Sequence, residues 1–575
     1  MLVGLVDPSG NTEPRDLRTL ADWTVSRRLQ SIPGVAEVLG MGGGVKQLQI
    51  QPNPDKMLAM GISYGELHEA ASNAVSNSTG GFLTESSQEI MVRNLAMTTD
   101  LDAIGNTVVT HVNDRPIRIK DVANVAWDIE PMRGDAGMGS KLLGDHKEAK
   151  GYPGVILSIT KSPGFDTLTL TDEVETALED LKASMPEGVE LVTLYRQSDF
   201  IDLAVGNLEE ALRDGAIMVA IILFLFLLNL RITLITLTAI PLSLGMTVLV
   251  FDLLGLSVNS MTLGGLAVAI GMVVDDAIVD VENVFRRLRE NALLEKPRNK
   301  LEVIAKASAE VRSSILYATV LIILVFLPLM ALSGVEGRLF TPIAVATIVS
   351  MAASFLVSLT VIPVLSSYLL KPKPDQKHAD GIIERGLKKL FNATWLRLSL
   401  SQPLIVLFVA GALVVLAGIS FSKMGGNFLP AFREPTVLVA MTTAPGTSLK
   451  QTRDLADTAQ DLLLKIPEVE TVGYRLGRAE RGDHVVPVST VEFDLEFTRE
   501  TERERSEIIA EIRATMQTIP GTFSALSGPL ADRIGHMLSG VSAKVAIKVF
   551  GPDLDELRRI GTDIAEIARE IPGME

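Results

Sequence analysis

The sequence GGLAVAIGMVVDDAIVDVEN, residues 264–283, is an apolar run that contains two adjacent carboxylates, Asp275 and Asp276. If the apolar core begins near Leu263, Asp275 lies roughly 18 Å along a helix. That depth is well inside a hydrocarbon layer of about 30 Å. An ionised side chain in that layer costs at least about 2.5–3.5 kcal/mol, so acids at such a depth indicate function. Because two neighbouring carboxylates cannot both ionise easily, we expect this pair to bind and release protons.

Two further acids, Asp280 and Glu282, follow the pair and precede Arg286, near which the run ends. Asp280 follows Asp276 at i+4 and shares its helix face, whereas Glu282 follows Asp275 at i+7 and shares another face. We expect Asp280 to be solvated at the membrane interface, so that neutralising it has little effect. Glu282 is either solvated there or a further member of a proton relay.

Six apolar runs of membrane length are present, namely residues 215–230, 232–251, about 259–283, 314–332, 342–370 and 403–421. Within the third run, small side chains would let a neighbouring helix approach closely; they are Gly264, Gly265, Ala267 and Gly271. The connections 286–312 and 371–397 are rich in Lys and Arg, whereas the connections on the other side carry almost none. By the positive-inside rule the basic loops are cytoplasmic, and the soluble regions at both ends lie outside.

Composition supports a membrane protein with large soluble regions. Hydrophobic residues make up 47% of the 575 residues, while 21% are charged. The net charge is −16 without a basic arm or stripe, so we expect no nucleic-acid partner. The chain contains no cysteine, which excludes disulfides and thiolate metal sites. Its first residues lack the basic and apolar segments of a signal peptide.

The soluble regions, residues 1–210 and 428–575, show alternating α and β patterns. Expected helices cover residues 15–30, 54–58, 63–74, 167–184, 449–465, 499–517 and 554–570. Expected strands cover residues 2–7, 35–41, 45–51, 116–129, 154–162, 437–445, 469–477 and 489–497. The second region shows the split β-α-β order of a ferredoxin-like fold. The motif IPGV at residues 32–35 is echoed by IPGM at residues 571–574, which suggests an internal repeat.

Four segments together resemble RND (resistance–nodulation–division) efflux pump permeases. The most specific is GMVVDDAIVDVENVFRRLRE (271–290), which is similar to the fourth transmembrane helix of that family. YRQSDFI (195–201), LSGVEGRLFTPIA (332–344) and NFLPAFREPTVLVAMTTAPGTSL (427–449) support it. The last two resemble the heavy-metal efflux branch more than the drug-efflux branch. The likeness covers essentially the whole chain.

The resemblance implies an α-helical membrane bundle with α+β ferredoxin-like periplasmic porter subdomains. Residues 1–210 would be a porter subdomain with a docking insertion at about 53–151. Residues 211–371 would hold family helices two to six, 372–402 a cytoplasmic connection, and 403–421 the seventh helix. Residues 428–575 would be another porter subdomain and the truncated start of the next. The first helix, the first porter subdomain and the later helices would then be missing.

The resemblance also assigns a function. Asp275 and Asp276 would form the proton relay, with Glu282 as an additional candidate and protons, not a cofactor, as the coupling species. The basic relay partners would lie on a later helix, so we expect that this chain alone cannot couple protons to transport. The implied assembly is a homotrimer in the bacterial inner membrane, with a periplasmic adaptor and an outer-membrane channel.

The substrate stays open between metal cations and organic compounds. Metal-ligand types in the second soluble region form no recognisable spacing; they are Met441, Met516, Met537, Glu434, Asp483, His484 and His536. Thr447 and Ala269 stand where some metal exporters carry Met and an acid, which weakens the case for metal ions. Two further functions stay open, namely a non-transporting fragment that serves as a binding module, and a secretion or lipid exporter of the same superfamily. Gly42-Gly43-Gly44 lacks the GK[ST] of a P-loop, and we expect a transporter, not an enzyme.

Overall fold

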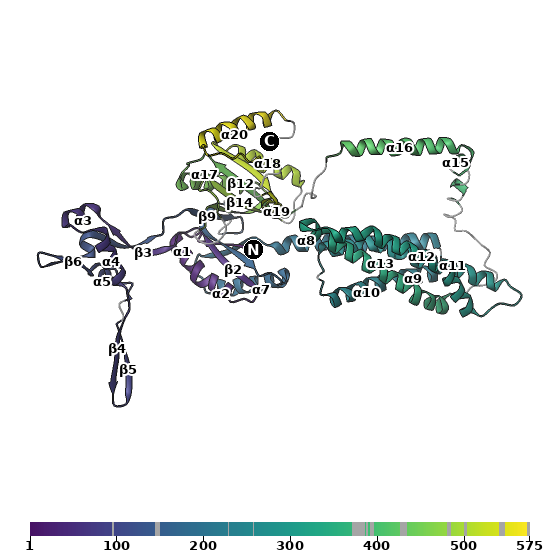
Figure 1. Cartoon of the computed structure of the whole chain (residues 1–575), viewed down its shortest axis with the longest axis horizontal. Coiled ribbons are helices and arrows are strands. Elements are labelled where there is room, and N and C mark those ends of the chain that lie inside the picture. The colour runs from purple at the N-terminus through teal and green to yellow at the C-terminus, as the bar shows by residue number, and fades with distance from the viewer. Residues whose placement is uncertain are drawn as a thin grey trace. The chain divides into compact units, whose positions relative to one another are not determined.

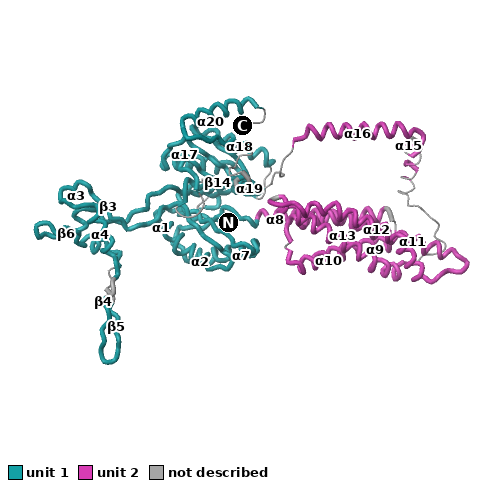
Figure 2. The backbone as a smooth tube through the Cα atoms, viewed as in Figure 1, with its two compact units in different colours: residues 1–198, 430–575 teal, residues 199–429 magenta. Residues whose placement is uncertain are grey.

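The computed structural model describes residues 1–94, 97–143, 150–227, 229–256, 258–370, 386, 389–391, 396–425, 434–479, 485–498, 503–539 and 547–571. Figure 1 labels the helices and strands along the chain. The chain divides into two compact units (Figure 2). Unit 1 contains residues 1–198 and 430–575, and unit 2 contains residues 199–429.

Unit 1 is built on a sheet that joins nine strands among the described residues. Its first half holds β1 (Leu2–Val6), β2 (Val35–Met41), β10 (Gly151–Lys161) and β11 (Glu190–Tyr195), in the spatial order β11-β1-β10-β2. A helical stretch links β1 to β2 and comprises α1 (Pro14–Leu20), the π-helical η1 (Ala21–Val25) and α2 (Ser26–Gln30). Helix α7 (Thr167–Lys182) links β10 to β11. Apolar faces of these helices pack on β1 and β10 and form one core.

The second half of the sheet repeats this order. It runs β12 (Val437–Thr443), α17 (Leu449–Leu463), β13 (Val469–Gly477), β14 (Thr490–Phe497), α18 (Arg505–Gln517) and β15 (Thr522–Ser527). The spatial order is β13-β14-β12-β15, and the neighbours are antiparallel. Helices α19 (Pro529–Ser539) and α20 (Leu554–Arg569) follow. Both halves therefore place their strands in the same β-α-β-β-α-β arrangement. The repeat predicted from IPGV and IPGM concerns the end of the chain beyond this half, where residues 572–575 lie outside the described residues.

Strand β9 (Gly134–Ser140) joins the two halves, because it pairs with β10 on one side and with β13 on the other. Its sequence GDAGMGS gives no strand signal. The reason is packing: a Cβ atom on Gly137 would lie 2.5 Å from the ring of Tyr474, so no side chain fits there. The sequence interpretation missed this strand for that reason.

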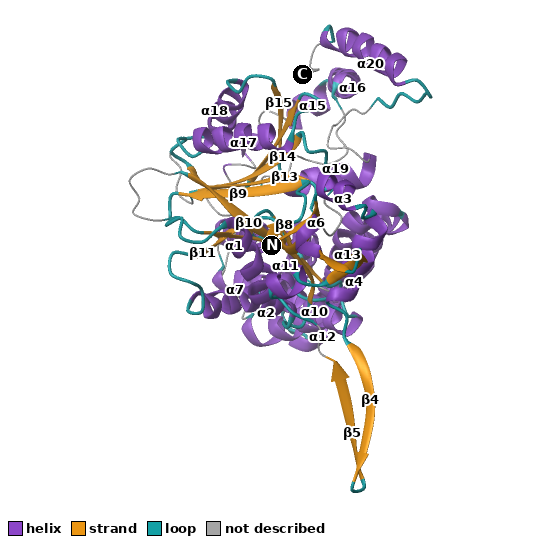
Figure 3. Ribbon diagram, turned by 90° about the vertical axis from the view of Figure 1, so that its left-hand side faces the viewer, coloured by secondary structure: helices purple, strands orange, loops and turns teal. Residues whose placement is uncertain are grey.

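A small lobe with its own core lies between β3 (Lys46–Pro52) and β8 (Ala123–Ile129), which pair with each other. It contains α3 (Pro54–Met60), α4 (Tyr64–Ala74), α5 (Leu101–Gly105), β6 (Val108–Val112), β7 (Arg115–Arg118) and α6 (Ile119–Val122). The hairpin of β4 (Ser78–Glu85) and β5 (Gln88–Asn94) extends away from α4 (Figure 3). The single strand expected over 116–129 is wrong. Helix α6 interrupts it because the Arg118 backbone N–H donates to the Asp121 carboxylate at 2.8 Å.

Unit 2 is helical. It contains α8 (Gln197–Leu227), α9 (Leu230–Leu237), α10 (Ala239–Leu254), α11 (Ser260–Ala292), α12 (Lys300–Phe326), the 3-10 helix η2 (Leu327–Ala331), α13 (Gly334–Leu369), α15 (Arg397–Ser401) and α16 (Pro403–Lys423). Helix α11 packs against α9, α10, α12 and α13. The cytoplasmic connection expected at 372–402 lies mostly outside the described residues.

Five helices among the described residues are long and apolar enough to cross a membrane. They cover Leu230–Leu254, Ser260–Ala292, Lys300–Ala331, Glu336–Leu369 and Pro403–Lys423, and each contains one of the expected runs or overlaps most of it. The sixth expected run, 215–230, falls on the second part of α8 and on the residues after it, and it is not among these five.

Candidate functional site

Asp276 is buried at the centre of α11, where only 8% of its surface is exposed. The hydroxyl of Ser354 on α13 donates to the Val273 carbonyl oxygen at 3.0 Å and lies 3.4 Å from the Asp276 carboxylate. This shared donor compensates the carboxylate only in part, so the site favours a carboxyl that can hold a proton. The sequence prediction named Asp276 but missed Ser354.

Asp275 points the other way. Its side chain is exposed on the surface of α11, and so is Glu282, which shares its helix face. The adjacent acids therefore have different surroundings, since successive side chains on a helix diverge by about 100°. Asp276 faces the bundle, whereas Asp275 and Glu282 face away from it. The relay assignment of all three stays a prediction.

The expectation that Asp280 is solvated is wrong. Only 2% of its surface is exposed, and neither carboxylate oxygen has a hydrogen-bond partner. The helix face explains this: Asp280 is one turn beyond Asp276 on the side that packs against the neighbouring helices. The position of Asp280 near the end of the span suggested contact with water, but the helix face on which a residue lies decides whether it is buried.

Buried hydroxyls on α13 follow helical spacing, and two of them contact α11. The buried hydroxyls belong to Thr347, Ser350, Ser354 and Ser358. The Thr347 hydroxyl donates to the Gly265 carbonyl oxygen at 3.3 Å, and the Thr247 hydroxyl of α10 donates to Ser350 at 3.2 Å. The spacing of these residues within 342–370 is the signal that could have identified them.

Close packing holds α11 and α13 together at one glycine. A Cβ atom on Gly265 would lie 2.7 Å from the Ile343 carbonyl oxygen and 2.8 Å from the Ala346 Cβ. Cβ atoms on Gly264 and Gly271 would meet nothing within 4 Å. Of the three glycines expected to admit a helix, the structure assigns that role to Gly265.

A polar network follows at the end of α11 that the positive-inside rule places in the cytoplasm. Asn283 donates to the Ala307 carbonyl oxygen at 2.7 Å and to Glu310 at 3.3 Å. Arg287 pairs with the same Glu310 carboxylate at 2.9 Å. The buried acids thus lie on one helix face that leads to a partly exposed, charged cluster.

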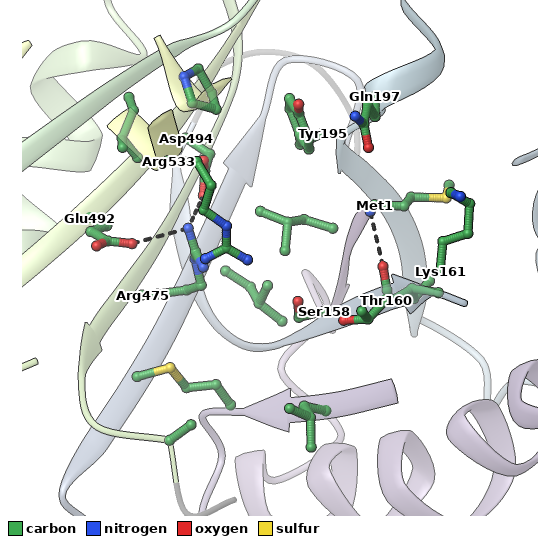
Figure 4. Close-up of a pocket in the computed structure, with 18 of the residues that line it drawn as sticks. Met1, Ser158, Thr160, Lys161, Tyr195, Gln197, Arg475, Glu492, Asp494 and Arg533 are labelled. Atoms are coloured by element: carbon green, nitrogen blue, oxygen red, sulfur yellow. Dashed lines mark hydrogen bonds and ion pairs between the residues drawn. The ribbon is translucent and has the colours of Figure 1, made fainter. Parts of the chain in front are cut away.

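Unit 1 contains a pocket of about 730 Å³ between its two sheet halves (Figure 4). Arg475 on β13 lies in its wall and pairs with Asp494 at 3.0 Å and Glu492 at 3.2 Å. Burial by itself would lower the pKa of Arg475, but these two carboxylates hold it above its ordinary value. Arg533 of α19 also lines the pocket. The wall therefore presents both charge signs, and its size suits a small organic molecule.

The metal-ligand candidates do not converge. Met441 and Met516 are buried in the apolar core of the second half. Glu434 is also buried, and its carboxylate accepts the backbone N–H groups of Leu530 at 2.7 Å and Ala531 at 3.1 Å, so it caps α19. Among the described residues, no group of three or more His, Asp or Glu side chains could hold a metal ion.

Asp483 and His484 lie outside the described residues. His536 and Met537 fall on α19, but their side chains are not described. The structure therefore leaves these four candidates untested.

The chain combines an apolar helical bundle that contains buried carboxyls with a sheet built from two β-α-β-β-α-β halves. This combination narrows the choice of protein family. The family model described as the AcrB/AcrD/AcrF family matches residues 1–575. The chain belongs to this family. The resemblance to RND efflux permeases is thereby confirmed for the whole chain, and the expectation of a transporter fold agrees with it.

Two curated relatives that this permease chain resembles are named for cation efflux. The Cation efflux system protein CusA of Escherichia coli (strain K12) is 33% identical over 581 residues, covering 99% of this chain and 54% of that protein. The Putative cation efflux system protein SilA of Salmonella typhimurium is 34% identical over 580 residues, with the same coverage. The chain thus spans about half the length of these relatives.

A solved structure entitled "X-ray crystal structure of a heavy metal efflux pump, crystal form II" has the same fold. Its TM-score is 0.85 at 25% identity, and the match covers 100% of this chain and 54% of that one. Crystal form I of a heavy metal efflux pump gives a TM-score of 0.82. The membrane bundle and the sheet-rich porter architecture of this permease chain are therefore shared with that structure.

Proposed function

We propose that this chain is part of the inner-membrane permease of a proton-driven RND efflux pump that exchanges metal cations for protons. The observation that carries the proposal is Asp276, a carboxyl buried between α11 and α13 with only a long contact to Ser354. Protonation would remove its charge and favour closer packing of the bundle, whereas deprotonation would disfavour it. No cofactor enters this scheme.

The proposed relay uses Asp276 on the inner face of α11 and Asp275 on its outer face, with Glu282 as a further candidate. A basic group on another helix could pair with the outer acids, because their face of α11 is exposed in this chain. The outer acids would then alternate between pairing with that basic group and binding a proton. In a bundle with two conformations, this alternation couples proton binding to movement of the helices.

We assign the sheet of unit 1 to porter subdomains on the periplasmic side. The spatial orders β11-β1-β10-β2 and β13-β14-β12-β15 both support a ferredoxin-like fold for each subdomain. The lobe between β3 and β8 would be the docking insertion. The cytoplasmic position of residues 286–312 rests on their excess of basic side chains.

The β4–β5 hairpin supports a homotrimer. It exposes large apolar side chains, with Phe82 58%, Leu83 60% and Met91 58% exposed. An extended hairpin that displays such residues is typical of a contact with another protein surface. We therefore propose that it contacts a second copy of the permease, and that an adaptor and an outer-membrane channel complete the pump.

Metal cations are the first candidate substrate, because the relatives' names specify cation efflux. The second candidate is an organic compound. It is favoured by the 730 Å³ pocket with charges of both signs and by the lack of a metal-binding group among the described residues.

The test is a resistance assay on the complete gene product that contains this chain, in a Gram-negative host lacking its own pumps. Copper, silver, zinc, cobalt and a panel of lipophilic drugs would be tested in parallel. Protection against metals supports the first substrate class, and protection against drugs alone supports the second. Protection against neither would indicate a binding module and would contradict the transport proposal.

Asp275→Asn and Asp276→Asn are the decisive variants in this assay. We expect each to abolish protection at unchanged membrane levels. Glu290→Gln is the matched control, because it removes a carboxylate from the exposed end of the same helix, where Glu290 pairs with Arg287. Retained protection in both aspartate variants would refute the relay assignment.

A further inference from the structure

Asp280 is a buried acid for which the two-aspartate relay has no role. Its exposed fraction is 2%, and both of its carboxylate oxygens are without a hydrogen-bond partner. Its neighbours on the same helix face, Ala277, Val281 and Val284, belong to an apolar core. An ionised carboxylate in such a place would be shielded from water and without a hydrogen bond.

Helix α12 contributes two polar groups near Asp280. They are Ser308 and Arg312, and the Ser308 hydroxyl is itself buried without a partner. Arg312 is exposed, and no hydrogen bond from it reaches the carboxyl. Glu310 is engaged by Arg287 and Asn283.

The other helices that pack on α11 offer little charge near Asp280. The charged residues of α13 are Glu336 and Arg338 at its opposite end, and its Tyr368 lies in the last turn. Helix α9 carries Arg231 in its first turn, and α10 carries Asp252 in its last turn, beyond the Asp276 level. On α11 itself, the titratable groups on the same face are Asp276, one turn away, and Arg287, two turns away and paired with Glu310.

We infer that Asp280 is a second buried proton-binding carboxyl of the bundle, placed in series between Asp276 and the cytoplasmic end of α11. Residues four apart on a helix have Cβ atoms about 5–6 Å apart, which one water molecule or one side-chain rotation can bridge. The hydroxyl of Ser308 supplies a group that can accept the proton of a neutral Asp280 or donate to its anion. A proton that leaves Asp276 would then pass through Asp280 to the partly exposed, charged cluster of Asn283, Glu310 and Arg287.

This inference rests on the proposed proton antiport, but its first test does not need transport. The purified chain would be labelled with aspartate carrying ¹³C in the side-chain carboxyl, placed in lipid nanodiscs, and followed by infrared spectroscopy during a pH titration without sodium. The isotope shift separates protonated aspartate from glutamate and lipid carbonyl bands. We expect two buried protonated components at neutral pH.

Asp280→Asn should remove one component and Asp276→Asn the other, whereas Glu290→Gln should remove neither. Asp280→Asn resembles the neutral acid in shape, so it should fold. If it does not, Ser308→Ala is the second variant, and it should shift the frequency of one aspartate component. A wild-type spectrum that neither variant changes would overturn the inference. So would a component that disappears when sodium is added, because Asp280 would then be a cation site.

The second test separates this inference from the proposed function. Substrate-driven proton movement would be measured with a pH-sensitive dye in proteoliposomes containing the complete gene product, with Zn²⁺, Ag⁺ and a lipophilic cationic dye as probes. We expect Asp280→Asn to slow proton movement about tenfold or more, with rescue by Asp280→Glu and unchanged Zn²⁺ or dye binding. If proton movement is normal in Asp280→Asn but lost in Asp276→Asn, the inference about Asp280 is overturned while the proposed antiport stands. No proton movement in the wild type would refute the antiport itself.

Discussion

The contact at Gly265 predicts how sensitive the bundle is to one methyl group. In Gly265→Ala the new Cβ would lie 2.7 Å from the Ile343 carbonyl oxygen and 2.8 Å from the Ala346 Cβ. Carbon atoms pack at about 3.5–4.0 Å, so α11 and α13 must separate by about 0.7 Å or more. Such overpacking destabilises a protein by about 1–3 kcal/mol.

Gly264→Ala is the matched control, because its Cβ would meet nothing within 4 Å. Both variants gain the same helix propensity, about 1 kcal/mol, so the difference between them isolates the clash. We expect Gly265→Ala to be less stable than Gly264→Ala by about 1–3 kcal/mol. The assay is reversible unfolding in SDS of the chain purified in detergent.

The same displacement should reach the acidic site. Val273 lies about two turns beyond Gly265 on α11, and there the Ser354 hydroxyl of α13 contacts the Val273 carbonyl oxygen and Asp276. We expect Gly265→Ala to change the infrared band of Asp276 as well. Equal stabilities of the two alanine variants, within about 0.5 kcal/mol, would show that α11 and α13 do not pack as described.

Three other predictions concern unit 1. Burial raises the pKa of Asp457 above its ordinary 3.8, although the Tyr474 hydroxyl donates to it at 2.6 Å. An acid whose pKa is raised by folding stabilises the folded state at low pH, and that contribution is lost as the pH rises through its folded pKa. Asp457→Asn should therefore flatten the fall in melting temperature with pH above pH 3.8. An unchanged slope of melting temperature against pH would contradict this. Glu434→Ala should destabilise α19 by about 0.5–2 kcal/mol, seen as faster hydrogen exchange of the first amides of the helix, and unchanged exchange would exclude the cap. Replacing residues 80–92 by a short turn should abolish trimer formation in light scattering while the melting temperature of the remainder is kept; a persistent trimer would mean that the hairpin has another role.

Much of this fold could be predicted from periodicity. The helix expected over 167–184 is α7, and that over 449–465 is α17, because each combines an apolar stripe with an N-cap, Asp166 and Ser448. Five of the apolar runs correspond to membrane-length helices, because length and hydropathy alone identify such a span. Strand β9 could not be predicted, because its Gly137 is required by the ring of Tyr474, which is distant in the sequence.

The candidate site was predictable in part. Adjacent acids in an apolar run identify Asp275 and Asp276, but the sequence does not show which of them faces inward. That depends on which side of α11 meets α13. The prediction for Asp280 was wrong for the same reason. Its closeness to the arginines in the sequence suggested that it meets water, but its helix face is buried. The hydroxyl residues of α13 follow helical spacing in the sequence, but only the structure shows that Ser354 meets Asp276.

The central claim is that protonation of Asp276 drives export, and a direct measurement is proton counter-transport. Proteoliposomes containing the complete gene product would be loaded with a pH-sensitive dye and given a Zn²⁺ or Ag⁺ gradient. The account predicts that substrate movement in the wild type is accompanied by opposite proton movement, and that Asp276→Asn loses both while Glu290→Gln keeps both. Substrate movement that continues in Asp276→Asn, or that moves no protons in the wild type, would contradict it.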